Sequence, residues 1–393
     1  MSAGEVSSVT GVARPRVSTR DRDALGRGLE RWLAGRRGAL VPRVLTLSTP
    51  EGTGMSSDTL LFEVAWSDGE HERLVARLAP SADAVPVFPR YDLECQYRTM
   101  EAARDHSPVP VPPLRGYEPD PVHLGTPFLV MGRVDGRVPP DIPPYTFGAG
   151  WVADASDADR ERLERGAVSV LAGIHGIRDA PAVCPWLVPS GEATPLDHLG
   201  APTEPGEHSA LRAHVDAQRA YAEWVLDGRP GPLIERGFAW LEEHWPAHEG
   251  DTVLSWGDAR IGNVMFDDCT PVAVLDWEMA TLGPRELDIG WMIFLHRFFD
   301  DLARQLDLPG LPDFLRRSEV ARVYAELTGH TPGDLDWYTA YAAVRHAIIM
   351  TRIGMRQVRF GEAALPDDLD DLVTHRASLE AMLSGTYWDS VPT

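Results

Sequence analysis

The chain changes character near residue 132, and this change limits the folds open to it. Residues 21–132 contain strand-like runs, among them TLLFEVAW and RLVARLA, which are joined through Ser67-Asp68-Gly69-Glu70. Asp-Gly between two apolar, β-favouring runs is a strong signal for a hairpin. After a stretch rich in Pro and Gly, helical patterns dominate residues 133–393. The sequence therefore predicts an α+β chain with a small, β-rich N-terminal lobe built on an antiparallel sheet and a larger, mainly helical C-terminal lobe.

The expected order in the first lobe is a helix, the hairpin, a second helix and a strand pair. Leu25, Leu29 and Leu33 recur at helical spacing, residues 90–104 have helical composition, and TPFLVMGRV follows a proline-rich break. Residues 1–20 are predicted to form a flexible tail. In the second lobe, helices are predicted over residues 157–176, 209–226 and 233–245. Three short strand-like runs follow, TVLSW, VMF and VAVLDW, and are expected to form small hairpins before further helices.

The charge balance narrows the possible partners. The chain has 37 Lys and Arg against 59 Asp and Glu, a formal net charge of −22. Nucleic acid and anionic membranes require a basic face, so neither is expected as a partner. The three cysteines are far apart, and we find neither a signal-peptide core nor an uncharged stretch long enough to span a bilayer. We expect a cytoplasmic protein that acts on a small molecule, with its oligomeric state open.

Two carboxylates and an amide mark the candidate site. Asp258 and Asn263 form a D-x-x-x-x-N pattern, and Asp276 follows in VLDWE. Phosphoryl transfer needs a carboxylate that accepts the proton of the attacking hydroxyl, together with an amide and a second carboxylate that hold metal ions. A loop followed by a short hairpin can bring all three to one cleft, and hard oxygen ligands favour magnesium over zinc. Asp258 is therefore predicted to be the catalytic base, with Asn263 and Asp276 as metal ligands.

The catalytic stretch resembles the signature of the aminoglycoside phosphotransferase (choline kinase-like) family, which reads H-G-D-x-x-x-G-N and then D-W-E. The matching positions are Gly257-Asp258, Gly262-Asn263 and Asp276-Trp277-Glu278, and the order of similar segments runs from about Val44 to Arg359. The resemblance implies a protein-kinase-like two-lobe fold, ATP and Mg²⁺ as cofactors, and phosphate transfer to a hydroxyl of a small molecule. GTP stays open as the donor.

Family positions also suggest nucleotide contacts. Arg77 stands where a strand residue contacts the α- and β-phosphates, and Glu94 is the predicted helix carboxylate that orients it, with Gln96 as the alternative. The run FLVMGR resembles the hinge that binds adenine, and a Gly- and Ser-containing loop could cradle phosphates. A plain hairpin turn, a solvated Glu94 and a buried strand end are the simpler explanations. The predicted nucleotide-binding residues are Gly54, Ser56, Ser57, Arg77, Glu94, Val130, Met131 and Arg133.

A row of arginines near the C-terminus bears on the acceptor. Its members recur at helical spacing: Arg345, Arg352, Arg356 and Arg359. This row could bind a carboxylate or phosphate groups, or it could be a surface face paired with local acids: Glu362, Asp367 and Asp368. We name the row the arginine stripe.

The D-W-E block adds a second clue. Asp276 to Pro284 resembles the branch found as kinase domains attached to acyl-CoA dehydrogenases, which acts on hydroxyacyl-CoA compounds. That resemblance implies a hydroxyacyl-type acceptor as an alternative to an aminoglycoside-like one. The possible acceptor contacts are Arg260, Glu278, Arg352 and Arg356.

Three further residues near the motifs have predicted roles. Trp256 stands where the family has His and is not expected to supply the same hydrogen bonds, so a catalytically weak, kinase-fold protein that binds a nucleotide or metabolite is the alternative function. His175 lies on an apolar helical face and is predicted to be a core residue. Asp288 is predicted to accept backbone N–H groups near the catalytic loop and to stiffen the site without contacting substrate.

Overall fold

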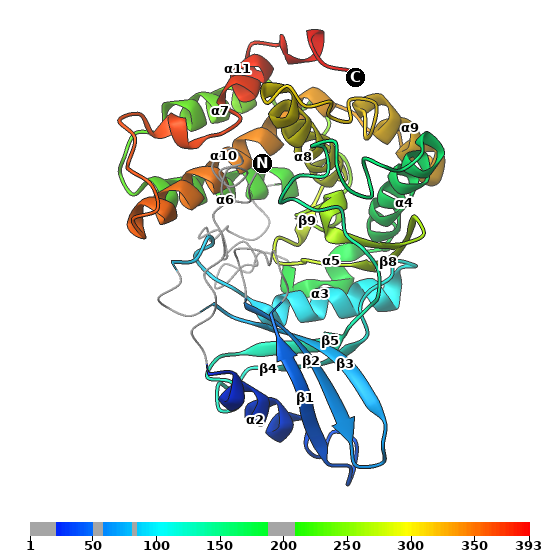
Figure 1. Ribbon diagram of the computed structural model, residues 1–393. Coiled ribbons are helices and arrows are strands. Elements are labelled where there is room, and N and C mark those ends of the chain that lie inside the picture. The colour runs from blue at the N-terminus through cyan, green and yellow to red at the C-terminus, as the bar shows by residue number, and fades with distance from the viewer. Residues whose placement is uncertain (1–20, 50–57, 81–84, 188–208) are drawn as a thin grey trace.

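The protein has a sheet at one end and most of its helices at the other, with helix α3 between them (Figure 1). The structure, a computed structural model, describes residues 21–49, 58–80, 85–187 and 209–393. The predicted tail, residues 1–20, lies outside the described residues.

The five-stranded sheet is antiparallel and has the order β1-β2-β3-β5-β4. Its strands are Pro42–Ser48 (β1), Asp58–Trp66 (β2), His71–Leu78 (β3), Leu114–Glu118 (β4) and Phe128–Gly132 (β5). The predicted hairpin is confirmed, because β2 and β3 pair from Asp58 opposite Leu78 to Ala65 opposite His71. Gly69, in the turn, has φ +90°, which favours glycine.

Helix α2 (Arg22–Leu33) covers one face of this sheet, and Asp21 caps it by accepting a hydrogen bond from the N–H of Asp23. Its apolar side, which includes Leu29 and Trp32, packs with alternate residues of β2, β3 and β5 to form a small core. Trp32 meets Phe128 with ring centroids 5.3 Å apart. Because strand residues alternate between faces, the residues that do not enter this core point toward the helical lobe.

Helix α3 (Leu93–His106) lies between the lobes, where it contacts β4 and β5 and contributes its buried residues to the core of the helical lobe. Its buried residues Leu93 and Met100 belong to the larger core and not to the small core under α2. The segment before it is also attached to the helical lobe, because the Tyr221 hydroxyl donates to the Val87 carbonyl (2.9 Å) and Arg352 Nε donates to the Pro86 carbonyl (2.9 Å). Residues 85–106 therefore form a second connection between the lobes, besides the chain that leaves β5.

The helical lobe is organised around two long buried helices, α8 (Glu286–Gln305) and α10 (Leu335–Arg359). The surrounding helices are α4 (Asp157–His175), α5 (Ala180–Val183), α6 (Ala210–Leu226), α7 (Pro232–Glu243), α9 (Arg317–Thr328) and α11 (Arg376–Leu383). The three helices predicted in this lobe are confirmed as α4, α6 and α7. Ser156 and Ser209 cap α4 and α6 through their side-chain oxygens, as expected for helix starts.

Four short strands interrupt the helices, namely β6 (Val253–Ser255), β7 (Val264–Asp267), β8 (Thr270–Val274) and β9 (Thr281–Gly283). β7 and β8 form a hairpin, as predicted, whereas β6 pairs with β9, a strand that the sequence analysis did not anticipate. The two pairs frame the segments that carry the candidate site.

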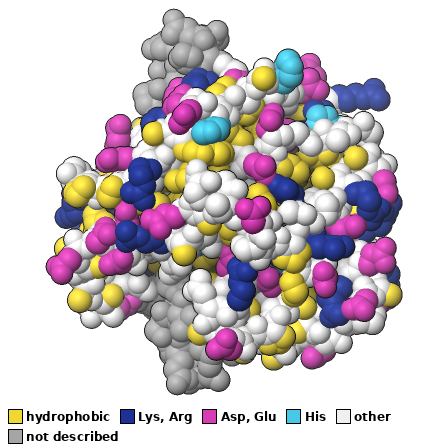
Figure 2. Space-filling model, turned by 90° about the horizontal axis from the view of Figure 1, so that it is seen from above, with side chains coloured by type: hydrophobic (Ala, Val, Ile, Leu, Met, Phe, Trp, Pro, Cys, Tyr) yellow, Lys and Arg dark blue, Asp and Glu magenta, His cyan; other side chains and the backbone are white. Residues whose placement is uncertain are grey.

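Charged side chains of both signs are interspersed over the face of the molecule that is seen from above (Figure 2). Within the described ranges, no helix combines the length and the apolar character that crossing a membrane requires.

A buried histidine makes stability depend on pH. His375 is 2% exposed, and its ring lies 5.2 Å from that of Phe294. Burial lowers the pKa of His375 from 6.5 to about 4, although a hydrogen bond to the Ala343 carbonyl opposes the shift. The unfolded chain therefore binds a proton below pH ~6.5 that the native chain excludes until pH ~4. We expect the free energy of unfolding to keep its full value above pH 6.5, as far as this histidine is concerned. Between pH 6.5 and pH 4 it should fall by about 3 kcal/mol, because the unfolded chain takes up the proton and the native chain does not.

Urea unfolding at pH 7.5 and pH 4.5 checks this expectation. The His375→Gln variant should lose less stability between the two pH values than the unmodified protein. Equal losses in the two proteins would show that His375 does not carry the pH dependence.

Candidate active site

Asp258 lies between β6 and β7, in a loop that holds its carboxylate from several sides. Oδ2 accepts hydrogen bonds from Nδ2 of Asn263 (2.6 Å) and from Nε of Arg260 (3.1 Å). Oδ1 accepts a hydrogen bond from the indole Nε1 of Trp291, in α8, at 2.8 Å. The side chain keeps 17% of its surface exposed, so the carboxylate is oriented by its neighbours and still reaches solvent.

The β7–β8 hairpin brings Asn263 and Asp276 to the same end of the site. Asn263 ends a short 3-10 helix (Ile261–Asn263), and its carbonyl accepts a hydrogen bond from the N–H of Leu275 (2.9 Å). The next residues on the two sides, Val264 and Val274, are paired in the hairpin. The arrangement expected from the spacing of these motifs is therefore the one that the structure has.

Arg77 reaches this end of the site from β3. Oδ1 of Asp276 accepts hydrogen bonds from both Nη1 and Nη2 of Arg77, each at 3.1 Å, and the Glu278 carboxylate lies 3.8 Å from Nη2. Burial alone would lower the pKa of Arg77, but the charges of Asp276 and Glu278 outweigh it and raise the pKa. Arg77 therefore stays cationic at the boundary between the lobes.

The predicted ion pair between Arg77 and Glu94 is wrong. Glu94 pairs with Arg98, one turn further along α3, at 2.6 Å, and its side chain is 45% exposed. Gln96, the alternative on the same helix, is buried. The D-W-E segment of the helical lobe supplies carboxylates to Arg77, whereas Glu94 lies on the exposed side of α3.

Strand β5 places the predicted adenine contacts on different sides. Met131 pairs with Val75 and shares the sheet face of Arg77, whereas Val130 is buried in the small core under α2. Since neighbouring strand residues point to opposite faces, the prediction that Val130 lines the cleft is wrong. Val75 is a cleft-side residue that the sequence analysis missed, and only the pairing of β3 with β5 identifies it.

Arg133 follows β5 and has an exposed side chain. Its backbone N–H donates to the Arg73 carbonyl (2.8 Å), and the N–H of Gly132 donates to the Pro113 carbonyl (2.7 Å). These two backbone donors are thus engaged within the protein, and Met131 is the predicted hinge residue whose side chain lies on the same sheet face as Arg77. The other predicted phosphate contacts, Gly54, Ser56 and Ser57, lie outside the described residues.

Asp288 holds the backbone in front of Asp258, as predicted. It is fully buried and accepts hydrogen bonds from the N–H groups of Trp256 (2.7 Å) and Gly257 (2.9 Å) and from the Ser255 hydroxyl (2.7 Å). His175, confirmed as a core residue, lies 3.0 Å from the same carboxylate through Nε2. Burial would raise the pKa of Asp288, but the hydrogen bond and charge of His175 and the bonds from the loop lower it.

Trp256 links the catalytic loop to the D-W-E segment. Its ring is fully buried, and its indole N–H donates to the carbonyls of Leu275 (3.0 Å) and Asp276 (3.1 Å). Asp276 itself has φ +56°, in the left-handed region that residues other than glycine seldom adopt. Trp256 is not expected to supply the hydrogen bonds of the family's His, but its indole supplies bonds of its own to the D-W-E segment.

Gly257 allows the catalytic loop to approach the D-W-E segment closely. It has φ +89°, and a Cβ atom there would lie 2.0 Å from the Met279 carbonyl oxygen. We expect Gly257→Ala to lower the free energy of unfolding by about 3 kcal/mol or more, from overpacking and backbone strain together. Gly69→Ala is the matched control in urea unfolding, because Gly69 has φ +90° with no atom within 4 Å of the added Cβ. Equal effects of the two substitutions would show that the contact with Met279 is unimportant.

Arg260 is half-buried between two carboxylates. Its guanidinium donates to Asp258, as described above, and to Oδ2 of Asp141 (2.5 Å). Burial lowers the pKa of Arg260, but the charges of Asp141 and Asp258 outweigh this and raise it. The predicted acceptor contact therefore touches the predicted base directly.

The arginine stripe turns inward. Arg345 is 2% exposed and Arg356 is 9% exposed, so a solvated surface face does not describe these two residues. Arg352 lies over the Trp224 ring at 4.2 Å and also donates to the Pro86 carbonyl. Arg359, at the end of α10, is exposed. The middle of the stripe thus faces residues 85–91, which connect the lobes.

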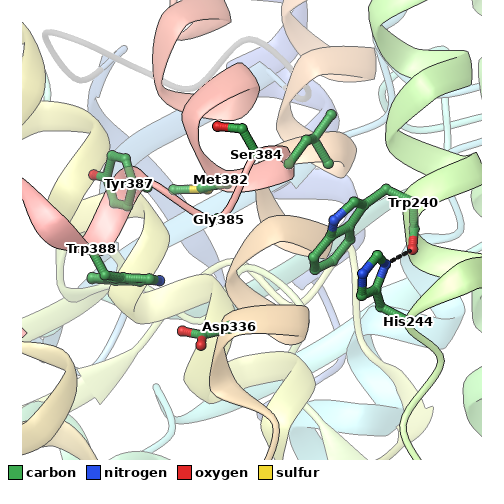
Figure 3. A pocket seen from close by; sticks show the side chains of 9 residues that line it. Trp240, His244, Asp336, Met382, Ser384, Gly385, Tyr387 and Trp388 are labelled. Atoms are coloured by element: carbon green, nitrogen blue, oxygen red, sulfur yellow. Dashed lines mark hydrogen bonds between the residues drawn. The ribbon is translucent and has the colours of Figure 1, made fainter.

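A pocket of about 300 Å³ lies elsewhere, between α7, α10 and the C-terminal residues (Figure 3). Its lining residues are Trp240, His244, Asp336, Met382, Leu383, Ser384, Gly385, Tyr387 and Trp388, none of which is a predicted site residue. Asp336 is already paired with Arg317, whose guanidinium also covers the Trp388 ring. This pocket is separate from the site around Asp258.

Residues 51–330 match the model of the phosphotransferase enzyme family. The chain belongs to this family. The matched range includes Arg77, Asp258, Asn263 and Asp276.

Two curated relatives of this family member carry the name acyl-CoA dehydrogenase. The chain is 23% identical over 321 residues to the probable acyl-CoA dehydrogenase IBR3 of Arabidopsis thaliana, covering 78% of the chain and 36% of the relative. It is 25% identical over 323 residues to acyl-CoA dehydrogenase family member 10 of Mus musculus, covering 78% of the chain and 26% of the relative. The chain thus spans about a third or less of these proteins.

Solved structures show the fold of this family member. A putative aminoglycoside phosphotransferase from Ralstonia eutropha superposes with a TM-score of 0.61 at 24% identity, covering 95% of this chain and 99% of that one. Aminoglycoside phosphotransferase APH(4)-Ia, solved with ADP and hygromycin B, has a TM-score of 0.52 at 15% identity, covering 91% and 98%. The predicted kinase-like, two-lobe α+β fold is confirmed.

Proposed function

We propose that the chain is an ATP- and magnesium-dependent phosphotransferase that acts on a hydroxyl group of a small molecule. The observation that carries the proposal is the meeting of Asp258 and Asn263 with Asp276 and its cationic partner Arg77. A base, two metal ligands and a phosphate-binding cation are the parts that phosphoryl transfer requires. The solved APH(4)-Ia complex, with ADP and hygromycin B bound, supports the same combination of nucleotide and small molecule.

The residues present fit magnesium. The side chains of Asn263 and Asp276 offer oxygen ligands, and Mg²⁺ in such sites takes one or two protein ligands and completes its shell with phosphate oxygens and water. In the part of the chain that the structure describes, no group of three or more His, Cys, Asp or Glu could enclose a metal ion. Magnesium bound with ATP would neutralise negative charge on the phosphates during transfer.

Asp258 then acts on the acceptor. Its carboxylate orients the acceptor hydroxyl and takes its proton, while the hydroxyl oxygen forms a bond to the γ-phosphorus and the bond from that phosphorus to the leaving ADP breaks. Arg77 binds phosphate oxygens, together with the loop that contains Gly54, Ser56 and Ser57. Met131 packs against the adenine, and GTP is an alternative donor because this contact is apolar.

For the acceptor, we propose a hydroxyacyl-type compound with an anionic group in preference to an aminoglycoside-like one. Arg356 is buried, and Arg352 is half-buried one turn before it. Burial raises the pKa of Tyr91, the charge of Glu278 raises it further and the charge of Arg356 lowers it, so these three residues lie near one another. A desolvated guanidinium binds carboxylate and phosphate groups strongly. The names of the curated relatives support the same class. Arg260 and Glu278 would contact the acceptor closer to Asp258.

A screen of acceptors tests both parts of the proposal, with the transferred phosphate detected by mass spectrometry. Hydroxyacyl-CoA compounds, free hydroxy acids, aminoglycosides, macrolides and amino alcohols would each be incubated with ATP and magnesium. Transfer to the hydroxyacyl compounds is expected, and transfer to aminoglycosides alone would overturn the acceptor class. Absence of transfer to every acceptor, with ATP bound, would favour the binding-protein alternative.

Variants of the arginine stripe sharpen this screen. Arg356→Met should raise KM for an anionic acceptor, whereas Arg359→Met, which changes an exposed arginine of the same helix, should leave it unchanged. Equal KM values for the two variants would remove the stripe from the acceptor site.

A further inference from the structure

Trp291 is a buried side chain whose single polar group points at the predicted base. It is 2% exposed, and its indole N–H donates to Oδ1 of Asp258 at 2.8 Å. An indole has one donor and no acceptor, and a buried donor is costly without a partner. Oδ1 is the oxygen that Asn263 and Arg260 do not contact, so the bond from Trp291 limits rotation of the carboxylate about its own axis.

Arg345 holds the Trp291 ring from α10. Its guanidinium lies 4.4 Å from the ring centroid, and Nη2 lies 3.4 Å from the Gly257 carbonyl oxygen, to which it donates. It is 2% exposed, and its Nε has no hydrogen-bond partner among the described residues. A buried cation with an unused donor is unfavourable unless nearby charge or a ring face compensates it. The Trp291 face and the charges of Asp288 and Asp258 provide that compensation.

The other two donors to Asp258 have competing partners. Nδ2 of Asn263 also donates to the backbone carbonyl of Asp258 (3.1 Å), and Arg260 also donates to Asp141. The indole N–H of Trp291 has Asp258 as its partner within the described part of the chain, and its ring is fixed by Arg345 on one side and by Phe294 and His346 at 6.4 Å and 6.2 Å. Of the three donors, Trp291 is the one whose hydrogen bond to the Asp258 carboxylate is shared with no second acceptor among the described residues.

We propose that Trp291, held in place by Arg345, is the residue that positions the Asp258 carboxylate toward the acceptor hydroxyl. The inference rests on the proposed function, in which Asp258 is the base, and adds a positioning residue from α8 that lies outside the catalytic loop. Reaction rates depend steeply on such orientation, because a displacement of about 1 Å lowers turnover by about 100-fold.

The hydrogen bond is testable without turnover. In a ¹H–¹⁵N spectrum of the full chain, the Trp291 indole resonance is identified by its loss in Trp291→Phe. In Asp258→Asn the carboxylate that accepts this hydrogen bond becomes an amide, so the Trp291 resonance should shift. The indole resonance of Trp337, whose N–H donates to the Leu241 carbonyl, should stay in place. A Trp291 resonance that does not respond to Asp258→Asn would overturn the proposal.

Kinetics then test the positioning role. Trp291→Phe should lower kcat by about 10- to 100-fold and leave KM for the nucleotide within about twofold of that of the unmodified protein. Each kcat is calculated per nucleotide-binding site, and these sites are counted by calorimetry. Trp337→Phe removes one buried indole hydrogen bond at a distance from the site and should leave kcat unchanged. Equal kcat values for the two variants would overturn the positioning role. A wild-type protein that phosphorylates no acceptor would instead contradict the proposed function, and the resonance would still decide whether Trp291 holds Asp258.

Discussion

Asp258→Asn is expected to lower kcat by about 10²- to 10⁴-fold, the range that general acid–base catalysis contributes. The amide has nearly the same shape as the carboxylate, so the loop should keep its fold, but the amide cannot take the proton of the acceptor hydroxyl. Magnesium-dependent nucleotide binding should persist, because Asn263, Asp276 and Arg77 are unchanged. Initial rates of phosphate transfer and calorimetric titration with ATP measure the two properties separately.

Asp267→Asn is the matched control for this substitution. Asp267 ends β7, four residues beyond Asn263, and is exposed. This variant should keep the rate of the unmodified protein. If Asp258→Asn turned over as fast as Asp267→Asn, Asp258 could not be the base, and if it lost nucleotide binding together with turnover, the loss could not be assigned to proton transfer.

The second large effect is expected at Asp288. In Asp288→Asn an amide NH₂ must face donors that now bond to the carboxylate, which include the N–H groups of Trp256 and Gly257. Buried donors without acceptors make the native state less stable, and we expect a loss of about 3 kcal/mol in the free energy of unfolding. Turnover should fall as well, because these donors belong to the two residues that precede Asp258.

The pH dependence of the free energy of unfolding provides a second test of the role of Asp288. The pKa of Asp288 is lowered in the native state, so its contribution is present above the unfolded pKa of about 3.9 and is lost as the pH falls through the lower native value. Urea unfolding below pH 4 should therefore show a smaller change in Asp288→Asn than in the unmodified protein.

Asp370→Asn separates stability from activity. Asp370 is also buried and accepts a hydrogen bond from the N–H of Leu233, but burial raises its pKa, and it lies away from the catalytic loop. This variant should keep the kcat of the unmodified protein per folded molecule. If both aspartate variants lowered kcat equally, Asp288 would have no specific role in holding the loop.

Local patterns predicted the fold and the centre of the site because the relevant spacing is short. The Asp-Gly turn predicted the β2–β3 hairpin, and the distance from Asp258 to Asn263 and the following hairpin placed both residues near Asp276. The two hairpins and the Asp258–Asn263 loop pair residues that are close together in the sequence, so a short stretch of sequence is enough to predict them.

The errors lie where long-range packing decides. The face of Val130 is set by the register of β5 against β3, which does not follow from local composition. The pair of Glu94 with Arg98, four residues further along the same helix, does follow from local spacing, but whether Glu94 reaches Arg77 depends on how α3 packs between the lobes. β9 escaped prediction because three residues carry too little pattern to identify a strand. Trp256 and Trp291 act through indole donors whose acceptors are distant in sequence or on another element.

The attachment of residues 85–106 to the helical lobe has a consequence for motion. Any rotation of the sheet away from the helices must occur about an axis that passes near both connections, because Pro86 and Val87 are hydrogen-bonded to the helical lobe. Arg77 would travel with the sheet, whereas Asp276 and Glu278 would not. Such a rotation would separate Arg77 from both carboxylates, so these ion pairs favour the arrangement in which the sheet lies against the D-W-E segment.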